Sequence, residues 1–168
     1  MVSIELLRRY PFFAGLSQEN MAALAKVADE ISVETNHYFF HEDDEVDCFY
    51  LILEGAVAIV FELPAQDVKH TISEQFARSM KTRDVTISTV GTGDVFGWSG
   101  LVPPHYATAG GKAITPCHIV AFNCKKLMPL FEQDYQFGFL MVRKSARVIR
   151  DRLRDLRIES LASISEPV

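Results

Sequence analysis

The sequence predicts a mainly β protein, an antiparallel roll or barrel flanked by helices. Between residues 31 and 122, short segments rich in β-branched and aromatic residues are separated by turn-forming residues, as is typical of strands. These segments are HYFFH, CFYLIL, AVAIVFEL, DVTISTV and CHIVAF. Because no helical segment separates them, the pattern argues against a parallel sheet with helical crossovers. The chain has 168 residues, of which 48% are hydrophobic, so it can bury a core without disulfides or metal.

Helices are expected on both sides of the strands. Near the N-terminus, residues 3–9 can form a short helix, and Ser17 can cap a helix over residues 18–30, where apolar residues recur at helical spacing. After the strands, Asn123 can cap a short helix, and residues 132–159 are predicted to form a longer one. Residues 64–83 are polar and aperiodic, and we interpret them as a long hairpin excursion.

The long C-terminal helix carries a narrow apolar seam. Its residues follow one another at intervals of four and three, which is a heptad pattern. They are Val142, Ala146, Ile149, Leu153 and Leu156. A seam this narrow, with arginines on both sides, favours pairing with an identical helix over packing into a globular core. We therefore predict a homodimer; the alternative is a helix that folds back on its own domain.

Composition excludes several classes of protein. Residues 1–142 hold 10 Lys/Arg against 18 Asp/Glu, and this acidic body argues against a broad nucleic-acid surface. No apolar run is long enough to span a membrane. The three cysteines are too few and too scattered for a disulfide framework or a zinc site, and they favour a cytoplasmic location.

Residues 91–113 form the segment most suggestive of ligand binding. Their sequence, GTGDVFGWSGLVPPHYATAGGKA, contains six glycines in 23 residues. Such glycines let the backbone approach a ligand, and a helical turn opening at Phe96 and Gly97 would direct free N–H groups outward. Glycine-rich turns are also common at the corners of all-β proteins, so this segment alone does not define a phosphate site.

Four segments follow one another in the order and at about the spacing of a known domain family. They are PFFAGLS, DCFYLILEGAVAIV, GTGDVFGWSGL and the amphipathic terminal helix. Together they resemble the cyclic nucleotide-binding domain, which is the sensor domain of the catabolite activator and fumarate–nitrate regulator superfamily. The resemblance covers about residues 10–158. It implies an eight-stranded jelly roll (a double-stranded β-helix) with N-terminal helices over residues 1–128. It further implies a dimerisation or lid helix over 129–159 and leaves a flexible tail over 160–168.

The resemblance also implies a phosphate-binding cassette, from which this chain departs at both anchoring positions. Phe96 and Gly97 match the family's Phe-Gly-Glu, but Trp98 replaces the Glu that accepts the ribose 2′-hydroxyl. The family's phosphate-binding Arg falls on His105, Tyr106 or Ala107, depending on the gap chosen. An indole cannot accept the ribose hydrogen bond, and none of the three residues carries a guanidinium. We therefore expect weak or absent cAMP binding.

The predicted pocket lies between residues 96–101 and a strand over residues 105–113, with the backbone N–H groups of residues 97–100 as anion donors. The residues expected to form it are Phe96, Gly97, Trp98, Ser99, Gly100, Leu101, His105, Tyr106 and Thr108. On the terminal helix, the positions that face adenine in such regulators fall near Leu156 and Arg157. We expect no metal and no resident cofactor, and a small anionic or nucleotide-like molecule as the ligand.

Three functional interpretations remain open. Phe-Gly-Trp-Ser at residues 96–99 resembles a variant cassette of stand-alone bacterial members, which implies a pocket shaped for another ligand or filled by the tryptophan. The chain is then either a non-catalytic sensor module or a ligand-free dimeric interaction scaffold. A cupin-like metalloenzyme is the third interpretation, suggested by His37, His41 and Glu42, although residues four apart on a strand lie ~13 Å apart.

Two further features narrow the expected partners. The acidic run over residues 42–47 lacks the mid-loop glycine and the final glutamate of a calcium loop, so we interpret it as a solvated turn. After the predicted terminal helix, only ESLASISEPV remains. We therefore expect neither the DNA-binding domain of the superfamily's transcription regulators nor a membrane partner.

Overall fold

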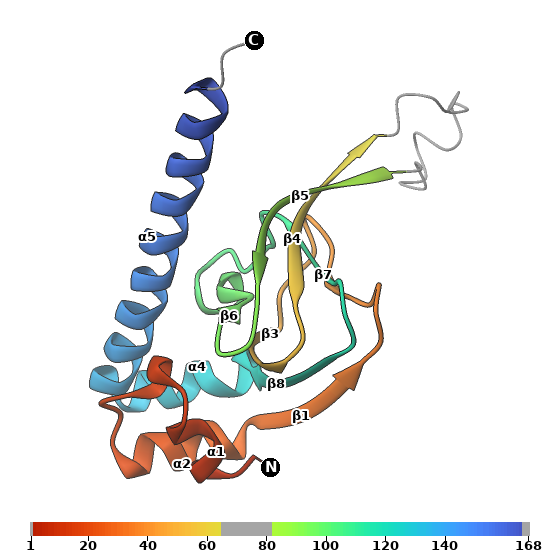
Figure 1. Cartoon of the computed structure of the whole chain (residues 1–168). Coiled ribbons are helices and arrows are strands. Elements are labelled where there is room, and N and C mark those ends of the chain that lie inside the picture. Colours follow the sequence, from red (N-terminus) through yellow and green to blue (C-terminus); the bar gives the residue numbers. More distant parts are fainter. Residues whose placement is uncertain (1, 65–81, 166–168) are drawn as a thin grey trace.

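The computed structural model describes residues 2–64 and 82–165, which form eight strands in two four-stranded antiparallel sheets (Figure 1). The first sheet has the order β1 (Ala28–Val33), β8 (Cys117–Asn123), β3 (Cys48–Glu54) and β6 (Val95–Phe96). The second has the order β2 (Tyr38–Phe40), β7 (Gly110–Ala113), β4 (Val57–Pro64) and β5 (Thr82–Val90). The predicted mainly β roll with eight strands is confirmed.

Most strand neighbours are distant in the sequence, as a roll requires. In the first sheet, β8 pairs with both β1 and β3, so that Phe122 lies opposite Ala28 on one side and Phe49 on the other. In the second sheet, β4 and β5 pair over their whole length, from Val57 opposite Val90 to Pro64 opposite Thr82. The predicted excursion over residues 64–83 joins these two strands, but residues 65–81 lie outside the described residues.

The N-terminal helices match the prediction except at one boundary. They are α1 (Ile4–Arg8), the 3-10 turn η1 (Pro11–Phe13) and α2 (Gln18–Lys26). Ser17 caps α2 as predicted, since its Oγ accepts a hydrogen bond of 3.1 Å from the Asn20 N–H. The predicted helix over residues 18–30 is too long, because β1 begins at Ala28 and pairs along its whole length with β8. Sheet pairing overrides the helical spacing of the last residues.

Two helices follow β8, α4 (Cys124–Gln133) and α5 (Tyr135–Ser165). Asn123 caps α4 as predicted, by accepting a hydrogen bond of 2.9 Å from the Lys126 N–H. The predicted bounds 132–159 of the long helix are wrong at both ends. Asp134 Oδ1 accepts the Phe137 N–H at 3.0 Å and so starts α5 at its own cap. At the other end, α5 continues to Ser165, because no glycine or proline interrupts residues 139–165. Most of the predicted flexible tail, residues 160–165, is therefore helical.

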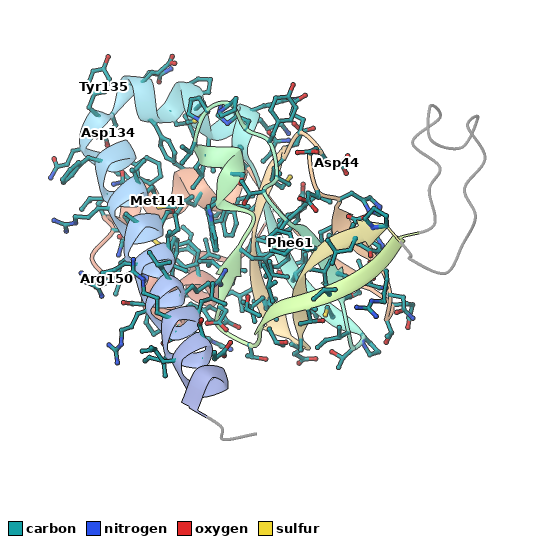
Figure 2. All side chains as sticks on the ribbon, turned by 90° about the horizontal axis from the view of Figure 1, so that it is seen from above. Asp44, Phe61, Asp134, Tyr135, Met141 and Arg150 are labelled. Atoms are coloured by element: carbon teal, nitrogen blue, oxygen red, sulfur yellow. The ribbon has the colours of Figure 1, made fainter. Side chains whose placement is uncertain are left out.

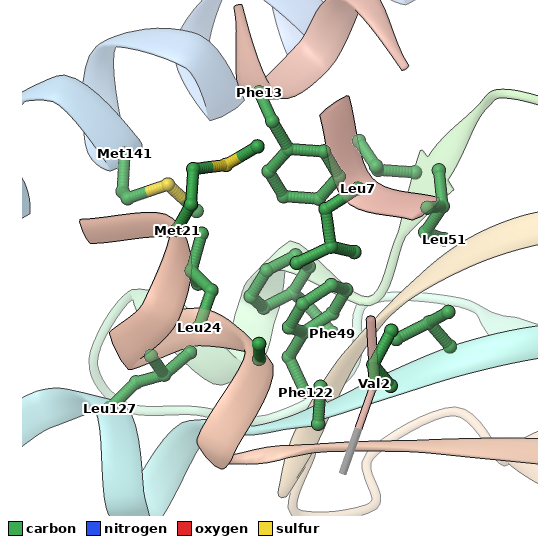
Figure 3. Packing of buried hydrophobic residues seen from close by; sticks show 14 of the residues in the cluster. Val2, Leu7, Phe13, Met21, Leu24, Phe49, Leu51, Phe122, Leu127 and Met141 are labelled. Carbon is green, nitrogen blue, oxygen red and sulfur yellow. The ribbon is translucent and has the colours of Figure 1, made fainter. Parts of the chain in front are cut away.

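The main core lies between the helices and the first sheet, and it holds α5 in place (Figure 3). Phe49 and Phe122 stack at its centre, with ring centroids 4.4 Å apart and an interplanar angle of 6°. Phe137 and Met141 of α5 are buried in the same cluster. α5 thus packs on its own domain along one face, while its C-terminal part extends beyond the roll (Figure 1).

In the part of the chain that the structure describes, no helix is long and apolar enough to cross a membrane.

The core makes a direct prediction for stability. Phe49 is 2% exposed and stacked on Phe122, so Phe49→Ala should remove about 3–5 kcal/mol from the free energy of unfolding in a urea titration. Phe61→Ala is the matched control, because Phe61 is 39% exposed on β4. Equal losses in the two variants would contradict this assignment of the core.

Candidate functional site

The cassette turn begins with a glycine that no other residue can replace without strain. Gly97 follows β6 with a φ of 77°, in the left-handed region. A Cβ there would lie 2.9 Å from the Cys48 carbonyl oxygen and 3.0 Å from Tyr50 Cδ2. The 3-10 turn η2 (Trp98–Leu101) starts at this glycine, as the predicted helical turn required. The side chains of Phe96 and Trp98 therefore leave the chain on either side of a fixed corner.

Aromatic side chains fill the interior of the roll beside the cassette. Phe96 stacks on Tyr50, with ring centroids 4.8 Å apart, and contacts Phe39 and Phe40 at 5.1 and 6.1 Å. Phe40 also covers Gly111, where an added Cβ would lie 2.9 Å from Phe40 Cζ. These rings occupy the end of the roll that the resemblance assigns to a ligand.

The cavity left at the cassette is small and uncharged. Its volume is about 40 Å³, whereas pockets for small-molecule ligands usually measure about 300–1,000 Å³. Its lining residues are Phe40, Ile59, Phe96, Gly97, Trp98, Ser99, Ala107, Thr108 and Ala109. Of the three positions proposed for the family's arginine, only Ala107 lines this cavity, and it carries a methyl group. No described lining residue bears a charge that could bind a phosphate.

The Trp98 ring contacts the long C-terminal helix. The guanidinium carbon of Arg152, on α5, lies 4.5 Å from the centre of the Trp98 ring. Arg152 Nη2 also donates a hydrogen bond to the Val95 carbonyl of β6. Burial lowers the pKa of the Arg152 guanidinium to about 10, and the charge of Asp94 opposes this effect. No periodic pattern indicates this contact, because Arg152 is one of several arginines on the helix.

Four of the predicted pocket residues, Gly100, Leu101, His105 and Tyr106, lie around the cassette without lining its cavity. Gly100 and Leu101 are buried, and the Gly100 N–H donates to the Gly97 carbonyl at 3.2 Å, so it is not a free anion donor. His105 Nδ1 contacts the Gly100 carbonyl at 3.1 Å and supports the turn from outside. Tyr106 is 54% exposed. Ser99 and Thr108 do line the cavity. The predicted strand over residues 105–113 is shorter, since β7 begins at Gly110.

The predicted seam on α5 is exposed along its whole length. Val142, Ala146, Ile149, Leu153 and Leu156 all face away from the domain's core, as does Arg157. Two further residues, Tyr135 and Phe139, extend the seam toward the start of the helix at the same intervals, and both are exposed. Figure 2 shows Tyr135 on the outside of α5, whereas Met141 lies buried between the helix and the domain. The same alternation of four and three residues would have identified Tyr135 and Phe139 in the sequence.

The side chains proposed for metal binding have other partners. His41 Nδ1 lies 3.0 Å from each carboxylate oxygen of Glu62, and the Glu42 carboxylate accepts a hydrogen bond of 3.4 Å from the Glu62 N–H. The His37 ring lies edge-on to Phe39, with ring centroids 5.2 Å apart. In the acidic run, Lys125 Nζ pairs with Asp47 at 2.7 Å and with Glu45 at 3.2 Å. Within residues 2–64 and 82–165, no group of three or more His, Cys, Asp or Glu side chains could hold a metal ion.

The cysteine thiols near the cassette are poor nucleophiles. Cys124 lies under Gly100, and burial raises the pKa of its thiol to about 12. Burial also raises the pKa of Cys48, with the charge of Asp47 as a second cause. The thiolate is the reactive form of cysteine, so both shifts disfavour reaction at these thiols.

A larger cavity lies outside the roll, between α5, η1 and the turn before β6. Its volume is about 420 Å³. Lys144, Arg147 and Arg152 contribute positive charges to its wall, and Asp94, Asp151 and Asp155 contribute negative ones. The balance of charges gives the cavity no preference for an anion. Beside it, Lys144 Nζ connects α5 to the residue after η1 by donating to the Ala14 carbonyl at 2.6 Å.

Comparison with known proteins identifies the fold. The family model of the cyclic nucleotide-binding domain matches residues 30–134. A candidate cyclic nucleotide-binding protein from Geobacter metallireducens is 27% identical, with 91% of this chain and 99% of that chain covered and a TM-score of 0.73. The N-terminal domain of a transcriptional regulator from Streptomyces coelicolor is 26% identical, with 90% and 94% covered and a TM-score of 0.62.

A more distant solved structure differs from these two in what is stated of its relation to cAMP. It is the regulatory subunit of a cAMP-independent protein kinase A from Trypanosoma brucei, which is 21% identical, with 86% of this chain and 46% of that chain covered and a TM-score of 0.62. A triple mutant of that subunit is bound to cAMP in its A site. A search of curated protein sequences returns no match to this chain.

The packing under the cassette predicts a sharp difference between two glycines. An alanine Cβ at Gly100 would lie 2.7 Å from Cys124 Sγ and 2.8 Å from the Val46 carbonyl oxygen. Gly100→Ala should therefore lower the free energy of unfolding by about 1–3 kcal/mol. Gly91→Ala is the control, because nothing lies within 4 Å of its added Cβ, and it should change stability by less than about 0.5 kcal/mol. Similar melting temperatures for the two variants would show that this turn is not packed as described.

Proposed function

This chain belongs to the cyclic nucleotide-binding domain family, and we propose that it is a non-catalytic regulatory module that does not bind cAMP tightly. The observation that carries the proposal is the cassette cavity, which measures about 40 Å³ and has no charged lining residue. A cavity of this size has room for a few water molecules at most. A larger ligand would have to displace Phe40, Phe96 or Trp98 before it could enter.

The electrostatic argument points the same way. A cyclic phosphate that is removed from water needs a charged partner, and arginine is the usual one because it can form two parallel hydrogen bonds. Losing one partner of such a buried pair costs about 2–5 kcal/mol, which corresponds to roughly 30-fold to several thousand-fold in affinity. Trp98 stands at the position of the family's Glu, and none of His105, Tyr106 and Ala107 carries the guanidinium of the family's Arg, which supports a loss of this size here.

The kinase regulatory subunit from Trypanosoma brucei is a precedent for a protein that has this fold and does not depend on cAMP. That subunit belongs to a cAMP-independent kinase, so a protein with this fold can serve as a regulatory subunit where cAMP is not the signal. We propose that the present chain likewise retains the regulatory scaffold. If it has a small-molecule ligand, the ligand is a small anion bound by backbone N–H groups near Trp98 and Ser99.

We further propose that the module is a homodimer through α5. The exposed seam spans seven positions from Tyr135 to Leu156, and its opposite face is already occupied by the core residues Phe137 and Met141. An exposed apolar stripe of this length at heptad spacing is typical of a coiled-coil interface. The three free cysteines support a cytoplasmic location for the dimer.

A specific observation favours a second candidate function. The aromatic cluster of Phe39, Phe40, Tyr50 and Phe96 fills the roll, which suits an interaction scaffold that has lost its ligand. Thermal-shift measurements with small anionic metabolites separate the two candidates. A ligand that raises the melting temperature supports the sensor, and a panel without effect supports the scaffold.

Isothermal titration tests the main proposal. We expect no measurable heat, or a Kd above about 10 μM, when cAMP or cGMP is titrated into the full chain, because both anchors of the nucleotide are missing. Unfolding monitored by circular dichroism on the same sample would establish that the protein is folded. A Kd below about 10 μM for either nucleotide would overturn the proposal.

Light scattering tests the dimer. The wild-type chain should show twice the chain mass of 18.9 kDa, and Leu153→Glu, which places a charge in the seam, should shift it toward the monomer. Arg154→Gln is the control, because Arg154 is an exposed neighbour outside the seam, and it should stay dimeric. A wild-type mass equal to a single chain would refute the interface.

A further inference from the structure

Arg152 is the residue through which the distal half of α5 reaches the cassette. Its side chain makes two contacts with the segment that surrounds Gly97. Nη2 donates to the carbonyl of Val95, and the guanidinium lies over the ring of Trp98 at 4.5 Å. A single side chain of the helix thus contacts the cassette both before and after Gly97.

The guanidinium is held by a ring face and a carbonyl rather than by a carboxylate. Among the described residues, no carboxylate lies within ion-pair distance of Arg152, and its Nη1 atom is buried without a hydrogen-bond partner. In water, all five N–H groups of an arginine form hydrogen bonds. In this environment some of those hydrogen bonds to water are lost and not replaced, which costs free energy. The contact is therefore specific in geometry but easier to open than a buried ion pair.

Beyond Arg152, the helix continues with exposed side chains from Leu153 to Ala162. Of these, Asp155, Leu156 and Glu159 border a small cavity against residues 88–90 of β5. Toward the start of the helix, Lys144 Nζ donates a hydrogen bond of 2.6 Å to the Ala14 carbonyl, beside the cavity of about 420 Å³ that α5, η1 and the turn before β6 border. Arg152 consequently lies between the firmly packed part of α5, around Met141, and the part whose side chains are exposed.

We propose that Arg152 and Trp98 form a latch that fixes the distal half of α5 to the cassette, so that cassette and helix change position together. The residue at position 98, which lies in the cassette, then serves as a positioning residue for the helix. The importance of the latch for regulation rests on the proposed function, whereas its existence can be tested without any ligand. Whatever displaces Trp98 must break the contact with Arg152 and release the helix.

The test uses the fluorescence of Trp98, which is the only tryptophan of the chain, together with hydrogen exchange. The informative variants are Arg152→Met, which keeps an unbranched apolar stem but removes the charge and the donors, and Arg152→Lys, which keeps the charge without the planar fork. In Arg152→Met we expect acrylamide quenching of Trp98 to rise by about twofold and amide exchange in residues 153–165 to rise by about tenfold. Arg152→Lys should give intermediate values. Exchange in β3 and β8 should stay unchanged, which separates release of the helix from general unfolding.

Arg150→Met is the matched control, because Arg150 is exposed on the same helix and pairs with Asp151. It should leave both measurements at wild-type values. Trp98→Leu breaks the latch from the other side, and combining it with Arg152→Met should add little further exchange to either single variant. The proposal is overturned if Arg152→Met leaves quenching and helix exchange unchanged, if the effects of the two variants simply add, or if exchange rises equally in the strands. Because no ligand is present, these outcomes are independent of the cAMP titration.

Discussion

The close approach of Gly97 to β3 determines the arrangement of the site. The Gly97 backbone lies so near the Cys48 carbonyl and the Tyr50 ring that a side chain cannot be accommodated, and its positive φ turns the chain sharply. Two aromatic residues flank this turn. Phe96 points into the roll and stacks on Tyr50, whereas Trp98 contacts Arg152 of α5. The backbone conformation at Gly97 therefore separates an inward half of the cassette, in which Phe96 packs inside the roll, from an outward half, in which Trp98 contacts α5.

The inward half explains why the site has so little free space. Phe96 joins Phe39, Phe40 and Tyr50 in a cluster that the close-packed interior of a small domain favours, because each buried ring contributes apolar surface and ring contacts. Removing one of these rings to admit a polar ligand would sacrifice that burial. The ligand would also meet uncharged walls. Packing and electrostatics thus act in the same direction, toward a stable but nearly closed roll.

Local patterns in the sequence predicted much of this fold and little of the site. Ser17 and Asn123 cap their helices as expected, because capping depends on residues only three positions apart. The end of α2 was mispredicted, since β1 is defined by pairing with β8, about ninety residues away. The cassette was located from Phe96 and Gly97 through a family resemblance. The partner of Trp98 could not be predicted, because Arg152 is 54 positions away and looks like its neighbouring arginines in the sequence.

The position of positive charge distinguishes this cassette from the pattern of its family. The resemblance implies an arginine beside the turn that faces the ligand, whereas here the lining of the cavity is uncharged and the guanidinium that contacts Trp98 comes from α5. A charge on the cassette would stabilise the ligand-bound state, whereas a charge on the helix stabilises the contact between helix and cassette. Ligands shift an equilibrium only by their unequal affinity for its two states. In this chain, the free energy that binding would have to overcome therefore includes the Arg152 contact as well as the aromatic packing. An effective ligand or partner is one that replaces the partners of Arg152 when it moves Trp98.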